Sequence, residues 1–415
     1  MGGGSGGHIT PAVAVIREII KIKPRARVEF WTDRKYYKNV VKITTEIGVG
    51  WGENEQGSGP KKPYIRVRKL MAGKFRRYAG WGIRDYFENI GITIKDLIIG
   101  NILGFCGFIG GIIQSFCRLA GKKGRPDVIF LKGGFVGLPV GIIAKILRIP
   151  YVIHESDAVP GLANRLLMKR ATVIATGMPI KNDKENDNRI IFTGTPVAPE
   201  FKVVSETKQK ALKKALGFDE DKSLVIVTGG SQGSEHINSA IRDILPEMLE
   251  FTSVGLIAGR KHYENMVDLK KYEDWDKAKL KSNFRLWNFS TIMNEILGAA
   301  DVVVSRAGAT TIAELASLKK AVVLVPFEKL PGGHQVKNAE KLAKDNAAVV
   351  IRDDRMMNQP GVLLEAVKHL ARSPRERREL AENLHERVKA DAALHLATII
   401  LETADGKEVV KDETR

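Results

Sequence analysis

Cysteine is scarce in this chain, because its 415 residues contain only two, Cys106 and Cys117, both inside one apolar stretch. Two cysteines exclude a disulfide framework and favour a reducing compartment. Histidine, cysteine and carboxylate side chains nowhere cluster at the spacing of a metal site, so we expect no metal ion. No aromatic stacking platform or known nucleic-acid reader motif accompanies the basic residues, so nucleic acid is not the expected partner.

Acidic residues are too few to balance the basic ones. Lysine and arginine number 66 and aspartate and glutamate 48, which gives a formal net charge of +18. This excess predicts an anionic partner, such as a membrane surface or a phosphorylated molecule. No signal peptide precedes the first motif, so we expect the protein to stay in the cytoplasm.

Glycine is concentrated in two loops, one in each half of the chain. The first reads GGGSGGH at residues 2–8, and the second reads GGSQG at residues 229–233, directly after an apolar run. A glycine-rich turn that opens a helix presents bare N–H groups and the positive end of the helix dipole to a phosphate. Two such loops predict two nucleotide-fold domains facing one cleft, with a phosphorylated or nucleotide-linked substrate.

Short apolar runs alternate with amphipathic stretches throughout the chain, which predicts an α/β fold of two Rossmann-like, doubly wound domains. We expect an N-terminal domain at residues 1–194 and a C-terminal domain at 195–385, followed by a terminal helix and polar tail at 386–415, whose helix packs back on the first domain. A phosphate loop of this kind normally follows a buried strand, but only Met1 precedes it. We therefore expect that the first strand is missing and that the true start lies upstream.

A basic run beside an apolar run predicts a membrane-facing surface. Residues 61–77 hold eight lysines or arginines, and residues 97–117 read LIIGNILGFCGFIGGIIQSFC. Three alternatives are open for the apolar run: a membrane span, an interfacial surface or buried core. About 20 apolar residues span a bilayer, but five glycines lower the helix propensity. The neighbouring basic run favours the interfacial surface on anionic lipid.

Candidate chemistry follows from three features. Residues 2–7 match the dinucleotide fingerprint G-x-G-x-x-G, with Asp33 as a possible ribose ligand. His8 follows this loop, and its ordinary pKa lies near neutral pH, which suits acid–base work. The segment at residues 301–314 reads as a buried strand, a small-residue turn and a helix, where backbone amides can hold a diphosphate. Glu314 lies about one turn into that helix and can accept two hydrogen bonds from a ribose cis-diol.

Further motifs complete a recognisable set. They are GGGSGGHITPA, LKGGFVGLPVG, IHESDAVPGLANR, TGTPV, GGSQGSEHIN and RAGATTIAEL, the last followed by a Pro-Phe strand end and then by His334-Gln335. In this order, from residue 2 to about residue 350, the set resembles the bacterial peptidoglycan N-acetylglucosaminyltransferase family that forms lipid II.

The resemblance implies a GT-B fold and a peripheral enzyme at the cytoplasmic face of the cell membrane, without a cofactor. The implied reaction is inverting transfer of N-acetylglucosamine from UDP-N-acetylglucosamine to the muramoyl 4-hydroxyl of lipid I, the undecaprenyl-diphosphate-linked N-acetylmuramoyl-pentapeptide. In this family the C-terminal domain holds the UDP-sugar, and the N-terminal domain holds the acceptor and touches the membrane.

The resemblance also implies roles for individual residues. The donor diphosphate is assigned to Ser231 and to the amides of Ala307, Gly308, Ala309, Thr310 and Thr311. Glu314 is assigned to the ribose, and Gln335 with His334 to the sugar hydroxyls. Contacts to donor or acceptor phosphate are assigned to Ser5, Gly6 and Gly7, and acceptor contacts to Gly133 and Gly134. His8 is the first candidate for the general base, with Glu155 and Asp157 as alternatives.

Three positions depart from the family pattern. The family usually reads His-Glu-Gln-Asn where this chain has Ser156 and Asp157 after the His-Glu pair. The family's Asn usually contacts the donor sugar, whereas Asp157 can accept hydrogen bonds but cannot donate them. Ala198 stands where the family usually has an arginine, so one phosphate-facing cation is missing.

Other functions are compatible with parts of this pattern. One is another GT-B enzyme, such as a lipid glycosyltransferase or a UDP-sugar 2-epimerase. A nicotinamide-dependent oxidoreductase rests on the G-x-G-x-x-G match alone. A catalytically lapsed membrane scaffold rests on Asp157, Ala198 and the missing strand.

Overall fold

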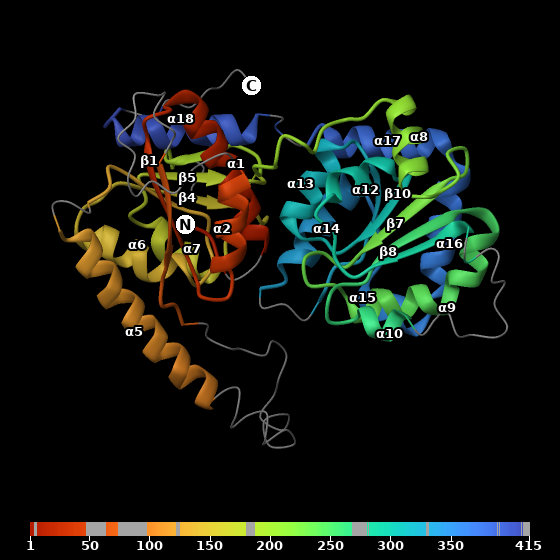
Figure 1. Cartoon of the computed structure of the whole chain (residues 1–415), viewed down its shortest axis with the longest axis horizontal. Helices are drawn as coiled ribbons and strands as arrows, with labels where there is room; N and C mark the ends of the chain where they lie inside the picture. Colours follow the sequence, from red (N-terminus) through yellow and green to blue (C-terminus); the bar gives the residue numbers. More distant parts are fainter. Residues whose placement is uncertain are drawn as a thin grey trace. The chain divides into compact units, whose positions relative to one another are not determined.

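The computed structural model divides into two compact units, Met1–Ala198 with Asp391–Arg415, and Pro199–Ala390 (Figure 1). The structure describes residues 1–3, 6–46, 64–73, 98–121, 125–179, 187–267, 280, 282–328, 332–387, 389, 391–407 and 409. Residues 48–63, which are rich in Gly, Pro and polar residues and predict a loop, lie outside these residues. Residues 61–63 and 74–77 of the basic run and the candidate phosphate ligand Ser5 also lie outside them.

Parallel strands form two sheets in the first unit. One sheet pairs β1 (Arg27–Thr32) with β2 (Tyr64–Lys69), and the other has the order β3 (Ile129–Leu131), β4 (Tyr151–Glu155), β5 (Val173–Thr176) and β6 (Ile190–Phe192). Strand β4 is buried at all five positions, as expected for a parallel strand covered on both faces.

Residues 1–3 lie between these two sheets, at the position where a strand normally precedes such a phosphate loop. The amide of Gly2 donates to the carbonyl of Trp31 at 3.4 Å, and the amide of Lys132 donates to the carbonyl of Met1 at 3.2 Å. The terminal ammonium donates to the carbonyl of Phe130 at 2.8 Å. Burial there lowers the pKa of this ammonium to about 5.

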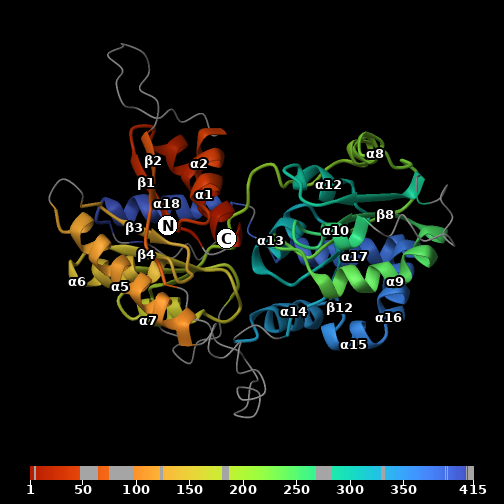
Figure 2. The same cartoon turned by 60° about the horizontal axis from the view of Figure 1, so that its bottom comes forward.

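Helices cover both faces of the sheets in the first unit. They are α1 (Gly6–Ile22), α2 (Tyr37–Glu46), α5 (Gly100–Leu119), α6 (Gly137–Ile146), α7 (Leu162–Met168) and α18 (Ala392–Ala404). Helix α18 lies along α1 (Figure 2) and closes a core with it and β4, in which Val15, Val152 and Leu396 are almost fully buried. The last helix of the chain therefore belongs to the same compact unit as the first.

The second unit has one parallel sheet with the order β12-β11-β10-β7-β8-β9. Its strands are β7 (Leu224–Thr228), β8 (Ser253–Ile257), β9 (Phe284–Trp287), β10 (Val302–Ser305), β11 (Ala321–Leu324) and β12 (Val349–Val350). Its helices are α8 (Glu206–Ala215), α9 (Glu235–Phe251), α10 (Tyr263–Val267), α12 (Met293–Ala299), α13 (Ala309–Ser317), α14 (His334–Lys344), α15 (Asp353–Asn358), α16 (Gly361–Arg372) and α17 (Pro374–His385). The two doubly wound α/β units that the sequence predicts are confirmed.

Helix α5 packs through its glycines. A Cβ on Gly73 would collide with the Gly104 carbonyl, and a Cβ on Gly111 would collide with the Met71 carbonyl. The Gln114 amide clamps the same segment, since it donates to the Lys69 carbonyl at 2.9 Å and its oxygen accepts from the Met71 amide at 2.9 Å. Small residues thus allow one side of the helix to approach the chain that follows β2.

The opposite side of α5 is apolar and exposed. Its exposed large side chains, with those of the preceding turn, are Ile98, Ile99, Ile102, Leu103, Phe105, Ile109, Ile113 and Phe116. Among the described residues α5 is the one helix long and apolar enough to cross a membrane, and only 22% of its apolar window is buried. Of the three alternatives for this run, buried core therefore does not fit, because glycines rather than large apolar side chains make most of the packed face.

Candidate functional site

The candidate residues of the first unit gather where β3 and β4 end. Open α/β folds bind their ligands outside the carboxyl ends of the parallel strands. Lys132 and Gly133 follow β3, and His154 to Asp157 form the end of β4 and the loop after it. His8 lies in the first turns of α1 and meets this group from the amino-terminal segment.

Lys132 is the centre of this group, with 2% of its surface exposed. Its Nζ donates to Nδ1 of His154 at 3.0 Å and also to the hydroxyl of Ser156. The other ring nitrogen of His154, Nε2, donates to the carbonyl of Gly194 at 2.8 Å, which leaves Nδ1 as the acceptor. Burial, followed by the charge of Lys132, lowers the pKa of His154 well below its usual value, so the ring is neutral.

Glu155 anchors the loop that follows β4. Its carboxylate accepts from the amide of Asp157 at 3.1 Å, from the amide of Gly161 at 2.9 Å and from Nδ2 of Asn164 at 2.8 Å. Three donors hold its two oxygens, and the side chain is buried. The geometry favours a role in shaping this loop over a role in proton transfer.

His8 is the candidate base whose environment keeps it unprotonated. Burial, followed by the charge of Lys132, lowers the pKa of His8 to about 4, while Asp157 and a hydrogen bond to the Lys132 backbone act in the opposite direction. Nδ1 of His8 is buried and has no hydrogen-bond partner in the part of the chain that the structure describes. At neutral pH this ring is a proton acceptor.

The glycine turn after β3 makes room for His8. Gly133 and Gly134 have φ angles of 97° and 78°, in the left-handed region that favours glycine. A Cβ on Gly134 would lie 3.3 Å from Nε2 of His8. The sequence assigned both the histidine and this turn to a site, and the structure brings Gly134 and His8 into contact.

In the second unit helix α13 begins directly after a glycine. Gly308 is the N-cap residue and makes no side-chain hydrogen bond to the helix, and the backbone N–H groups at the start of a helix point away from the helix body. This arrangement, with the positive end of the helix dipole, is suited to a diphosphate.

The second glycine loop is a tight turn before α9. The φ angles of Gly230 and Gly233 are 79° and 75°, and a Cβ on Gly233 would collide with the carbonyl of Ala258. Ser231 lies exposed at the tip of this turn. Ser234 caps α9 by accepting from the amide of Ile237.

Arg306 ties this loop to the ends of β10 and β11 and to α15. Its guanidinium donates to the hydroxyl of Ser234 at 2.7 Å, to the carbonyl of Val325 at 3.1 Å and to the carboxylate of Asp353 at 2.5 Å. Asp353 also pairs with Nδ1 of His236 at 2.6 Å. Sequence analysis did not identify this network, because Asp353 lies 47 residues from Arg306 and is not part of a motif.

Glu314 lies on α13, about one turn after the start of the helix. Its carboxyl group has no hydrogen bond or ion pair to another described residue, and burial raises its pKa to about 8. A partly exposed carboxyl group that lacks a protein partner is suited to accept hydrogen bonds from a ligand diol.

The start of α14 is fixed to the strand end before it. Oε1 of Gln335 accepts from the amide of Phe327 at 2.9 Å, which leaves the side-chain N–H₂ as the group for a ligand. Asn338 on the same helix is fully buried and donates to the carbonyl of Ala307 at 3.1 Å. His334, the first residue of α14, lies beside Gly332.

Some predicted residues have other surroundings. Asp33 accepts from the amide of Tyr36 at 2.9 Å just before α2, a local contact that leaves its possible ribose contact a prediction. Gly6 and Gly7 form the first turn of α1. Ala198 is the last residue of the first unit before the chain enters the second.

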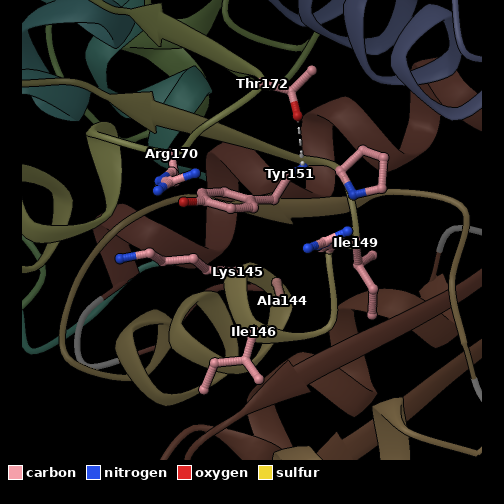
Figure 3. Close-up of a pocket in the computed structure, with 9 residues that line it drawn as sticks. Ala144, Lys145, Ile146, Ile149, Tyr151, Arg170 and Thr172 are labelled. Atoms are coloured by element: carbon pink, nitrogen blue, oxygen red, sulfur yellow. Dashed lines mark hydrogen bonds between the residues drawn. The ribbon is translucent and has the colours of Figure 1, made fainter.

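A hollow of about 440 Å³ opens at the opposite edge of the first unit's sheet, where β4 begins. Figure 3 shows Lys145 of α6 and Arg170 beside the ring of Tyr151, the first residue of β4. None of the candidate residues lines this hollow, so it is separate from the group around His8.

Comparisons with known proteins agree with the fold and the motifs. The model of the glycosyltransferase family 28 N-terminal domain matches residues 83–176, and that of the family 28 C-terminal domain matches residues 224–396. A relative from Bacillus pumilus is 31% identical over 97% of this chain and 97% of its own length. A relative from Listeria welshimeri is 34% identical over 86% of both chains. Both are named UDP-N-acetylglucosamine–N-acetylmuramyl-(pentapeptide) pyrophosphoryl-undecaprenol N-acetylglucosamine transferase.

Two solved structures show the same fold. MurG from Acinetobacter baumannii superposes with a TM-score of 0.66 at 21% identity over 97% of both chains. A putative UDP-N-acetylglucosamine 2-epimerase from Listeria monocytogenes superposes with a TM-score of 0.59 at 11% identity, over 97% of this chain and 96% of that one. The predicted GT-B architecture is confirmed, and the higher identity of the named transferases separates them from the epimerase. The chain belongs to glycosyltransferase family 28, among the UDP-N-acetylglucosamine–N-acetylmuramyl-(pentapeptide) pyrophosphoryl-undecaprenol N-acetylglucosamine transferases.

Proposed function

We propose that this protein transfers N-acetylglucosamine from UDP-N-acetylglucosamine to the muramoyl 4-hydroxyl of lipid I and so forms lipid II. The observation that carries the proposal is the full-length similarity to transferases of that name. The two glycine turns and the neutral His8 are the chemical features that such a transfer needs.

The donor half of the proposal rests on the second unit. The backbone amides at the start of α13, from Ala309 to Thr311, and the hydroxyl of Ser231 hold the diphosphate. Glu314 accepts hydrogen bonds from the ribose hydroxyls, and Gln335, with His334 beside it, holds hydroxyls of the sugar. Because amides and the helix dipole balance the charge of the diphosphate, they also stabilise UDP as it leaves.

The acceptor half rests on the group around His8. The acceptor oxygen attacks the anomeric carbon, the bond from that carbon to the diphosphate oxygen breaks, and UDP leaves with the electron pair. His8 accepts the hydroxyl proton during attack, and the carboxylate of Asp157 stabilises the imidazolium that forms. Asp157 is the alternative base, whereas the donors around Glu155 argue against that residue.

The lipid-linked acceptor and the membrane meet the first unit through α5. The helix is anchored at Gly104 to Gly73, which lies four residues beyond the end of β2. The residues before Gly104 therefore extend past the carboxyl edge of the sheet, the edge that also carries the group around His8, and Figure 1 shows this half of α5 extending from the unit. We infer a peripheral protein whose exposed apolar face enters the interface of an anionic membrane.

The direct test is to incubate the full chain with radiolabelled UDP-N-acetylglucosamine and a lipid I analogue in detergent micelles. The proposal predicts label in a product of lipid II mass and stoichiometric release of UDP. Release of free N-acetylmannosamine without acceptor would instead indicate an epimerase. A folded protein that binds UDP and labels no product would refute the proposal.

A further inference from the structure

The group around His8 includes a buried lysine that the proposed reaction does not use. Lys132 is the residue after β3, and its ammonium lies inside the protein rather than in solvent. Buried lysines are uncommon, because removal of an ammonium from water costs several kcal/mol unless other groups compensate. The groups that contact the ammonium of Lys132 must therefore compensate for this cost.

The contacts of Lys132 join three parts of the first unit. Its amide donates to the carbonyl of Met1, and its backbone hydrogen bonds with the ring of His8. Its ammonium donates to His154 on β4 and to Ser156 in the following loop. One residue thus links the amino-terminal segment, the first turns of α1 and the loop that carries Asp157.

We propose that Lys132 is a positioning residue, whose ammonium fixes the ring of His154 and the loop that carries Asp157. This inference rests on the proposed role of His8 as base. Ser156 and His154 each accept a hydrogen bond from the ammonium of Lys132. Two of its three N–H groups are therefore held in fixed directions.

The charges around this group support the same role. The carboxylates of Glu155 and Asp157 raise the pKa of Lys132, but burial is the larger effect and lowers it to about 8. The groups that face His8 are Lys132, Asp157 and the neutral His154. Burial is the largest effect that opposes protonation of His8 and the charge of Lys132 is the second, whereas Asp157 favours protonation. Removal of the lysine charge should therefore raise the pKa of His8, although burial still lowers it.

The matched variants are Lys132→Gln and Lys132→Arg. Glutamine has nearly the same reach and can donate to His154, but it has no charge, whereas arginine keeps the charge. Lys145→Gln removes an exposed lysine of α6 and is the control for total charge. The probe is the titration of the His8 ring in the full chain labelled with ¹³C-histidine, assigned with a His8→Asn variant.

We expect His8 to titrate near pH 4 in the parent, in Lys132→Arg and in Lys145→Gln, and about one pH unit or more higher in Lys132→Gln. The acid limb of kcat/KM for transfer should move with it, and the affinity for UDP should stay unchanged, because UDP binds the second unit. A folded Lys132→Gln protein with an unchanged His8 titration overturns the inference. If Lys132→Gln does not fold, Lys132→Met gives the same test without a buried amide.

The titration and the transfer assay separate the two proposals. A shifted His8 titration without a shifted acid limb supports the role of Lys132 and contradicts the role of His8 as base. An unshifted titration in an active enzyme contradicts the role of Lys132 alone.

Discussion

Glu314 is the residue whose ionisation should report donor binding most clearly. In the free protein burial raises its pKa to about 8, so the carboxyl group is mostly protonated at pH 7. Ribose hydroxyls that donate to the ionised form would lower this pKa, and UDP binding would then release a proton. We therefore predict that UDP affinity, measured by calorimetry, rises as pH increases from 7 to 9.

The control at this position is Glu314→Gln, which cannot ionise. Its UDP affinity should be independent of pH in this range, and at pH 9 it should be about tenfold or more below that of the parent, because hydrogen bonds to a charged acceptor are lost. Equal pH dependence in parent and variant would show that Glu314 does not bind the ribose.

Single residues also show where sequence reasoning stops. His8, Gly134 and Glu314 could be assigned from motifs, since glycine turns and helix starts leave local marks. Lys132 could not, because its burial depends on the end of β4 and on Met1, which lie far away in sequence. The Arg306–Asp353 pair was missed for the same reason, although arginine within RAGATTIAEL marked one partner.

At the scale of elements, buried parallel strands were the most predictable part of the fold. The short apolar run at residues 151–153 predicts a strand, and strand β4 is Tyr151–Glu155, covered on both faces. The amphipathic pattern with Pro11 before it predicts a helix from Val13 to Lys21, but α1 begins at Gly6, because glycines and a proline are not typical of a helix interior. The two-residue strand β12 was not predicted, because so short a run has no period.

The Arg306 network should hold α9, α15 and the end of β10 together. Removal of one partner of a buried ion pair typically costs 3–5 kcal/mol because the other charge is left unpaired. We predict that Asp353→Asn lowers the free energy of unfolding of the second unit by roughly this amount, measured by urea denaturation followed by fluorescence.

The matched control for this pair is Glu382→Gln, which removes the exposed ion pair with Lys319 at 3.1 Å. That change should cost about 1 kcal/mol or less. If both variants lost a similar amount of unfolding free energy, the Arg306 network would not stabilise the second unit more than an exposed ion pair does.

Helix α5 should mediate membrane binding through its exposed apolar side. Leu103→Glu replaces the most exposed of the large apolar side chains there, with 66% of its surface accessible. Insertion of one such side chain contributes about 1.5–3 kcal/mol, so sedimentation with anionic vesicles should weaken about tenfold or more. Val203→Glu, at an exposed apolar position in the second unit, should have little effect. Equal loss in both variants would point to net charge rather than to α5.

At the scale of the whole molecule, the two-domain α/β architecture followed from length and from the alternation of strands and helices. The assignment of the chain to a transferase family depended on motifs spread from residue 2 to about residue 350, and full-length relatives agree with it. The packing of α5 could not be predicted, because its five glycines allowed a span, an interface or a core helix. The exposure of its large apolar side chains argues against a core helix, and glycine contacts at Gly73 and Met71 make its packed side.

We propose above all that His8 takes the proton from the acceptor hydroxyl during sugar transfer from UDP-N-acetylglucosamine. The most direct measurement compares steady-state transfer to a lipid I analogue by the parent and by His8→Asn, with UDP affinity measured in parallel. We predict that His8→Asn lowers kcat by roughly a hundredfold or more and leaves the UDP affinity nearly unchanged. A folded variant whose kcat stays within about threefold of the parent would contradict it, since general bases contribute far more than this.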